Sequence, residues 1–459
     1  NYNSNGDFSN SIMSKIEVNT VAPQCGTTLT LGESGDTVTL GAGASQTGFG
    51  RTGTVDWDTT KKTTSFTATS GDGFFVDTTS SPLTVTLPAS PSAGDIVAIV
   101  DYAGTADTNS ITIARNGSNI NGGTDNLEID KENAGITLVY VDATQGWKGT
   151  ESFNLNDIKV QPAYIAATGG TITTCGNFKI HTFTGPGTFC VSCVGNPAGS
   201  DRVDYMVVAG GGAGGHRHGS GGGAGGFRES SGAVSGCYTA SPLGTGVLAL
   251  PVTVTGYPIT VGAGAGPNPF PPNQPGGSGS NSVFSTITSA GGGGGGTNPC
   301  GGTNGGSGGG GGADNLPGSV GSGNTPSVSP AQGKDGGVAG YGAPNYGMGG
   351  GGGATAAGGT GSPTVGGNGG AGATTSISGS STAYAGGGGA SVYQGGTSGT
   401  GGTGGGGTGT IGGPAPNAAN GTDGTANTGG GGGGGERSVP QDVGRAGGSG
   451  IVIIRYKFQ

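Results

Sequence analysis

The sequence predicts an all-β N-terminal region, then a small β unit, and finally a glycine-rich polyglycine II helix bundle, with essentially no α-helix. Two observations support this fold class. Short alternating runs rich in Val, Ile and Thr recur over residues 27–150 between turns of Gly, Asn, Asp and Pro. Most of the 115 glycines fall after residue 200, in tracts with few large apolar side chains. No segment of useful length has helical periodicity.

The first part of the chain is predicted to hold one β-rich domain. Residues 1–26 form an N-terminal segment expected to attach the chain, and residues 1–12, which precede Met13, are expected to be a trimmed or appended stretch. Over residues 27–150, runs such as LTVTLPAS, DIVAIVDY and ITLVYVD alternate apolar and polar side chains. Such alternation is typical of strands with one buried face.

A smaller β unit with its connector is predicted over residues 151–208. The run NFKIHTFTGPGTFCVSCV indicates two strands around a Gly-Pro-Gly turn, and DRVDYMVV indicates a third strand. Residues 448–459 end in GSGIVIIRYKF, whose apolar character matches the strand near Met206. If these two strands share a sheet, the glycine-rich region 209–447 leaves that sheet and returns to it.

We consider three alternatives for residues 209–447: collagen, disorder and a polyglycine II bundle. Collagen is excluded because runs such as Gly291 to Gly296 break any Gly-X-Y period. Composition favours disorder, since glycine-rich chains bury too little apolar surface to offset their conformational entropy. A polyglycine II bundle is the third, because glycine alone lets neighbouring backbones approach closely enough to hydrogen-bond sideways. The repeated glycine tracts and the bracketing strands favour this third structure.

The segments between the tracts contain Pro, Asn, Ser and aromatic residues, as in GYGAPNYGMGG, and are predicted to be loops at the ends of the bundle. A framework that presents variable loops suits molecular recognition. Aromatic side chains are preferred anchors in binding sites. The alternative is that these aromatic residues cap the ends of the glycine-rich bundle. The receptor-binding candidates are Phe270, Tyr341, Tyr346, Tyr384 and Tyr393.

Charge and motif content exclude several function classes. A net charge of −9 with only 17 Lys and Arg argues against binding nucleic acid or an anionic membrane surface. No apolar run approaches the roughly 18 residues that membrane insertion needs. The G-x-G-x-x-G matches follow from glycine abundance, so they do not indicate nucleotide binding. Three histidines and few charges allow no catalytic carboxylate pair or Ser-His-Asp cluster, so we expect no enzymatic activity and no cofactor.

Two motifs contain potential metal ligands. His216 and His218 are two residues apart, a spacing that puts both rings on one face of an extended strand, as in a metal site on a trimer axis. The alternative is a solvated or receptor-contacting loop. Cys190 and Cys193 match C-x-x-C without a second pair, which favours ordinary strand thiols or one disulfide over zinc or redox chemistry.

Several of these runs together carry a family resemblance. The stretches DYMVVAGGGAGG, GGGAGGFRES, YPITVGAGA, GSNSVFSTITSAGGGGGG and GGSGIVIIRYKF resemble the glycine-rich tail-fibre and adhesin proteins of tailed bacteriophages. The upstream run GDGFFVDTTSSPLTVTLPAS, with LVYVDATQGWKG, is similar to a β domain of phage fibre proteins, which implies a fibre and trimerisation role for residues 27–150.

The resemblance implies a virion tail-fibre protein, commonly a homotrimer, that contacts other tail proteins and acts at the host cell surface. Its loops would bind a host cell-surface glycan or an outer-membrane protein. The competing hypothesis is a purely structural virion or surface-filament component, in which the glycine domain is a rigid spacer. An enzymatic depolymerase would need a carboxylate-lined groove, for which the sequence offers no candidates.

Overall fold

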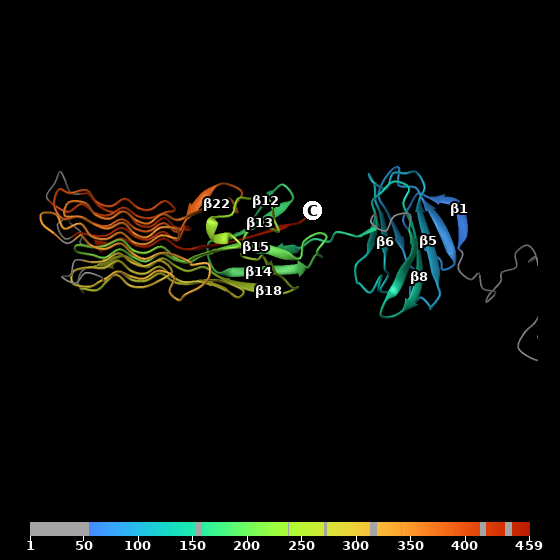
Figure 1. Cartoon of the computed structure of the whole chain (residues 1–459), viewed down its shortest axis with the longest axis horizontal. Helices are drawn as coiled ribbons and strands as arrows, with labels where there is room; N and C mark the ends of the chain where they lie inside the picture. The colour runs from blue at the N-terminus through green and yellow to red at the C-terminus, as the bar shows by residue number, and fades with distance from the viewer. Residues whose placement is uncertain are drawn as a thin grey trace, which may run out of the picture. The chain divides into compact units, whose positions relative to one another are not determined.

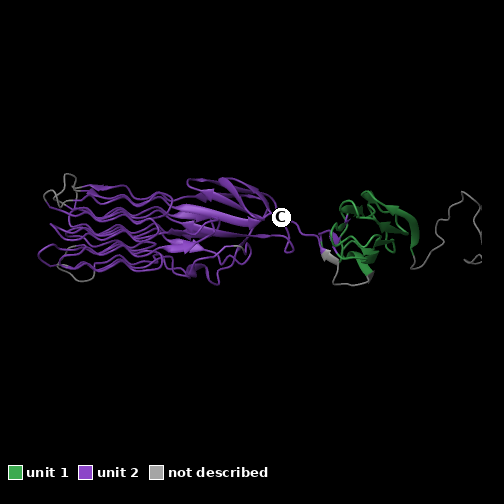
Figure 2. Ribbon diagram, turned by 90° about the horizontal axis from the view of Figure 1, so that it is seen from above, with its two compact units in different colours: residues 1–111, 116–123, 131–155 green, residues 112–115, 124–130, 156–459 purple. Residues whose placement is uncertain are grey.

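The computed structural model shows two compact units, which Figure 2 draws in separate colours. The first comprises residues 1–111, 116–123 and 131–155, and the second comprises residues 112–115, 124–130 and 156–459. The predicted N-terminal segment 1–26 lies outside the described residues. Those residues are 55–152, 158–236, 238–269, 273–312, 319–340, 342–413, 419–436 and 443–459.

Two five-stranded sheets lie between Asp56 and Val160, with strand orders β1-β3-β5-β8-β9 and β10-β7-β6-β4-β2. Strands β4 and β6 alternate buried and half-buried residues, as expected for strands that cover a core with one face. Val85, Ile99, Ile113 and Trp147 are completely buried. The strands are β1 (Asp56–Lys62), β2 (Phe66–Thr67), β3 (Asp72–Val76), β4 (Leu83–Thr86), β5 (Ile96–Asp101), β6 (Ile111–Ala114), β7 (Leu127–Ile129), β8 (Gly135–Asp142), β9 (Gly146–Ser152) and β10 (Ile158–Val160).

The second unit contains two larger sheets, with strand orders β11-β14-β18-β20-β21 and β12-β13-β25-β15-β16, and β17 pairs with β15. Their strands are β11 (Ala166–Thr168), β12 (Thr171–Cys175), β13 (Phe178–Phe183), β14 (Gly187–Cys193), β15 (Arg202–Val208), β16 (Phe227–Glu229), β17 (Leu250–Pro251), β18 (Gly256–Thr260), β20 (Ser282–Phe284), β21 (Ile287–Ser289) and β25 (Ile451–Lys457). Two small two-stranded sheets complete it: the pair β19 (Asn268–Pro269) with β24 (Val443–Gly444), and the hairpin β22 (Ala373–Thr375) with β23 (Thr382–Tyr384).

The last strand of the chain closes the second unit. β25 lies between β13 and β15 and is antiparallel to both, with Ile453 opposite Met206 and Ile454 opposite His181. The glycine-rich region therefore leaves the sheet at the end of β15 and returns to it at β25. Phe189 is buried at the centre of the apolar cluster between the sheets, with its ring centroid 6.1 Å from that of Phe284.

His181 in β13 is fully buried in this cluster. Its Nδ1 atom lies 2.7 Å from the carbonyl oxygen of Gly169, and its Nε2 atom lies 3.1 Å from the Tyr456 hydroxyl. Burial lowers the pKa of His181 below its ordinary value, because the charged ring would lose its hydration. The folded protein therefore holds this imidazole neutral.

Lowering the pH from about 7.5 to about 5 is expected to decrease the contribution of His181 to the free energy of unfolding. The unfolded chain binds a proton at this residue below about pH 6.5, whereas the folded chain resists it, so stability falls as the pH falls through that window by up to about 1.4 kcal/mol per pH unit. Calorimetry of wild type and His181→Gln at both pH values measures the difference. The comparison is needed because burial raises the pKa of Glu229, whose contribution has the opposite sign. Equal pH slopes in the two proteins would contradict the prediction.

The glycine-rich segments run side by side as long undulating traces that extend from these sheets (Figure 1). Neighbouring segments are joined by backbone hydrogen bonds, and successive residues of one segment donate to different neighbours. This pattern satisfies buried backbone groups without a side-chain core. The N–H groups of Gly221, Gly222 and Gly223, for example, donate to the carbonyl oxygens of Gly349, Gly432 and Gly293 at 3.1, 2.9 and 2.7 Å.

The predicted polyglycine II helix bundle is wrong, although the all-β part of the fold class agrees with the structure. Among the described residues the only helix is the short 3-10 turn Pro242–Gly244, and the glycine-rich segments form no helix. The high glycine content indicated only that neighbouring backbones can approach each other closely. Non-helical segments achieve that approach here, and their N–H groups reach the neighbouring segments directly, so helical winding is not required to satisfy them.

Candidate functional site

A tight turn at His216, Arg217 and His218 joins two glycine-rich segments. Beyond the turn the segments are bridged by a hydrogen bond from the Gly215 N–H to the Ser220 carbonyl at 2.9 Å. Arg217 and His218 have φ angles of +44° and +51°. This left-handed backbone is uncommon for residues other than glycine, and it reverses the chain within three residues.

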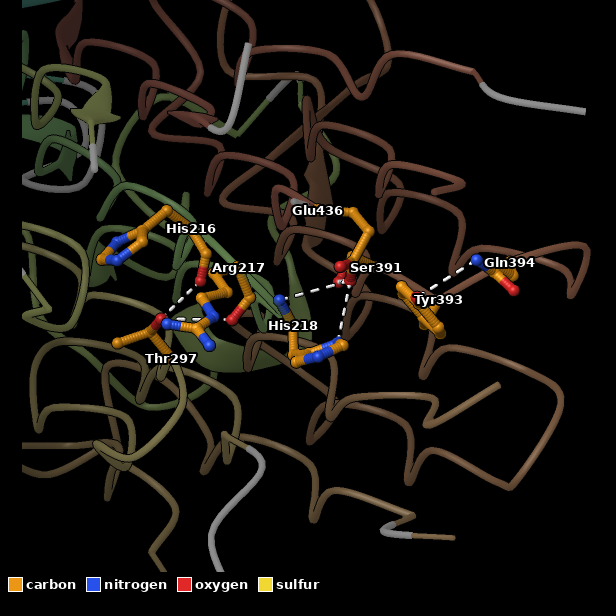
Figure 3. Close-up of polar contacts among 8 residues, drawn as sticks. All are labelled: His216, Arg217, His218, Thr297, Ser391, Tyr393, Gln394 and Glu436. Atoms are coloured by element: carbon orange, nitrogen blue, oxygen red, sulfur yellow. Dashed lines mark hydrogen bonds and ion pairs between the residues drawn. The ribbon is translucent and has the colours of Figure 1, made fainter. Parts of the chain in front are cut away.

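The buried carboxylate of Glu436 holds His218 in place (Figure 3). Its Oε2 atom lies 3.1 Å from the Nδ1 atom of His218 and accepts the His218 backbone N–H at 3.2 Å. The Ser391 hydroxyl donates to the same oxygen at 3.5 Å. Glu436 is completely buried, whereas the His218 side chain is 20% exposed. The carboxylate therefore fixes the orientation of a ring that solvent can reach.

Two tyrosine rings surround His218. The ring centroid of His218 lies 5.3 Å from that of Tyr393 and 6.0 Å from that of Tyr346, and the two tyrosines are 6.5 Å apart. Both tyrosines are partly exposed. The Tyr393 N–H donates to the Asn345 carbonyl at 2.7 Å, which ties their two loops together. We call His218, Tyr346 and Tyr393 the aromatic cluster.

His216 faces different partners. Its Nδ1 and Nε2 atoms lie 3.1 Å from the Asn268 amide nitrogen and 3.3 Å from the Asn273 amide oxygen. The Thr297 hydroxyl donates to its carbonyl oxygen, as Figure 3 shows. Within the part of the chain that the structure describes, no group of three or more His, Cys, Asp or Glu side chains could hold a metal ion. The geometry gives no support to the metal site considered for His216 and His218.

Comparison with known protein families assigns the segments that build this site to one family. The glycine-rich domain family matches residues 182–457, which is more than half of the chain. The chain belongs to the glycine-rich domain family. A search of curated proteins finds no match. Among the described residues, no helix of this glycine-rich domain protein combines the length and apolar character that a membrane span requires.

The glycine-rich domain brings together only some of the predicted binding residues. Tyr346 and Tyr393 meet in the aromatic cluster with His218, which the sequence suggested as a metal ligand or receptor-contacting residue. Tyr384 is 5% exposed and packs in an apolar cluster with Met206. Phe270 and Tyr341 lie outside the described residues.

Sequence reasoning missed Glu436, Ser391 and Gln394. The exposed Gln394 donates from Nε2 to the Tyr393 hydroxyl at 3.1 Å. Glu436 directly follows the uncharged glycine tract 429–435 and is the first charged residue after Asp423. A lone carboxylate at the end of such a tract is a usable signal, because a charge buried there requires polar partners.

Cys190 and Cys193 lie in β14, and both are exposed free thiols. Neither forms a disulfide within the described residues.

Proposed function

We propose that this glycine-rich domain protein is a bacteriophage tail-fibre adhesin that recognises a host cell-surface receptor through loops on its glycine framework. The observation that supports this function is the aromatic cluster, in which three partly exposed rings from separate loops meet and a buried carboxylate holds one of them, His218. Rigid aromatic side chains are the most frequent energetic anchors of binding surfaces. Recognition is non-covalent in this proposal, without enzymatic activity.

The remaining parts of the proposal follow from the family resemblance. The protein acts in the virion at the host surface, as a homotrimer that contacts other tail proteins, with the β domain in the fibre. Its ligand is a host glycan or outer-membrane protein. The low content of Lys and Arg, 17 in the whole chain, supports a surface ligand over nucleic acid.

A rigid spacer is the second candidate function. The observation that favours it is the dense lateral hydrogen bonding of the glycine-rich segments, which restrains each segment through several neighbours. A spacer needs this stiffness but not the exposed aromatic rings. The two functions therefore differ in whether the purified chain binds cells.

Purified full-length chain carrying a fluorescent label is expected to bind saturably to a few strains in a panel of bacterial cells. Flow cytometry measures the binding, and a hundredfold excess of unlabelled chain should compete it away. Strains that bind nothing provide the control for non-specific adsorption. Absence of saturable binding across the panel, including every strain that the parent virus infects, would reject the adhesin function and favour the spacer.

A further inference from the structure

The three rings of the aromatic cluster are held in a fixed arrangement. The rings come from three separate loops and their planes are inclined to one another, by 71° between His218 and Tyr393 and by 57° between Tyr346 and Tyr393. His218 and Tyr346 have φ angles of +51° and +48°. Such backbone persists where the surrounding structure determines it. The rings are therefore held in position before any ligand arrives.

The histidine of the cluster also offers a ring nitrogen for hydrogen bonding. The Nδ1 atom of His218 lies 3.1 Å from the Oε2 atom of Glu436, so Nε2 is the ring nitrogen that remains for a ligand. Nε2 has no hydrogen-bond partner among the described residues, and the His218 side chain is partly exposed. It can form a hydrogen bond with a ligand hydroxyl group.

The surroundings of the cluster argue against two charged ligand classes. Glu436 is completely buried and its Oε2 atom already accepts from His218 and Ser391, so an ammonium ligand would gain only the cation–π attraction of the ring faces. A polyanionic ligand is normally held by several basic side chains. Arg217 is next to His218 in the turn, and between residues 219 and 435 the only other positive residues are Arg228 and Lys334.

We propose that the aromatic cluster binds a neutral pyranose residue of a bacterial surface polysaccharide, a ligand class that rests on the adhesin function proposed above. A pyranose presents C–H groups on its faces and hydroxyl groups around its edge. The tyrosine rings match the faces, and Nε2 of His218 matches one hydroxyl. Sites of this composition, mainly apolar with a few placed polar groups, are typical of small-molecule recognition.

The first experiment uses an array of purified bacterial polysaccharides, both neutral and anionic, probed with the labelled full-length chain. Neutral hexose-containing polysaccharides are expected to bind. Tyr393→Ala should weaken that binding at least tenfold, and Tyr393→Phe should weaken it less because the ring is kept. Tyr102→Ala, at a 53% exposed tyrosine of the first unit, is the matched control and should bind as wild type does. Thermal unfolding confirms that each variant folds. Selective binding of anionic polysaccharides, or none on the array, would overturn the pyranose assignment.

The second experiment separates this inference from the adhesin function itself. Cells that bind the wild-type chain are treated with periodate, which cleaves vicinal diols of sugars, or with a protease that strips surface proteins. Loss of binding after periodate alone supports the pyranose ligand. Loss after protease alone overturns it and leaves the adhesin function in place, with a protein receptor. Absence of binding to any untreated cell rejects the adhesin function, while the array still decides whether the cluster binds sugars.

Discussion

Replacing Gly431 by alanine is expected to lower the free energy of unfolding of the glycine-rich domain by about 3 kcal/mol or more, at the upper end of overpacking effects. A Cβ atom at this position would lie 2.0 Å from the carbonyl oxygen of Gly222 and 2.9 Å from the backbone nitrogen of Gly388. The Gly388 N–H donates to that same oxygen at 2.9 Å. Backbone atoms that hydrogen-bond each other cannot move aside as a side chain can.

Gly266→Ala is the matched control for this prediction. A Cβ atom on Gly266 would meet no heavy atom within 4 Å. Its effect is therefore expected to stay within about 0.5 kcal/mol, as for other surface substitutions. Differential scanning calorimetry of both variants, following the transition of the glycine-rich domain, gives the comparison. Equal melting temperatures for the two variants would show that the segments are not as closely packed as the structure indicates.

Replacing both Tyr346 and Tyr393 by alanine is expected to weaken binding to host cells by about 100-fold or more. Aromatic residues at the centre of an interface commonly contribute about 2 kcal/mol each, and about 1.4 kcal/mol corresponds to tenfold in affinity. Both rings contact His218 and both are partly exposed, so their removal takes away most of the apolar surface of the cluster.

The binding curves of wild type, the double variant and Tyr102→Ala on the same strain measure this effect. Tyr102 is 53% exposed, and the Lys61 ammonium group lies 5.1 Å from its ring centroid. Thermal melting must show that the double variant is folded. Wild-type affinity in a folded double variant would exclude the aromatic cluster as the receptor-binding surface.

The aromatic residues show which part of the site could be predicted from the sequence. It selected Tyr346 and Tyr393 because aromatic residues in glycine-rich surroundings have few apolar neighbours nearby in sequence. The same reasoning selected Tyr384, which is buried against Met206 and Phe227 from distant strands. A sequence does not show which of its loops end beside an apolar sheet, because that depends on where each segment returns.

The β character of the chain could be predicted from its sequence, since alternating apolar residues between turns admit little else. For the glycine-rich region the sequence left disorder and closely packed backbones as alternatives, since few side chains are large enough to form a core there. The folded structure was needed to show that these backbones form no helix over the residues it describes, and to show which segments are neighbours. Glycine tracts are interchangeable in composition, so their order in space is set by the sheets and loops that join them.

The tertiary structure also decided the site. Glu436 and His218 are separated by 218 residues in the chain, yet one buried carboxylate oxygen accepts both the ring and the backbone N–H of the histidine. A buried charge requires such partners, and only the folded arrangement of the glycine-rich segments supplies them.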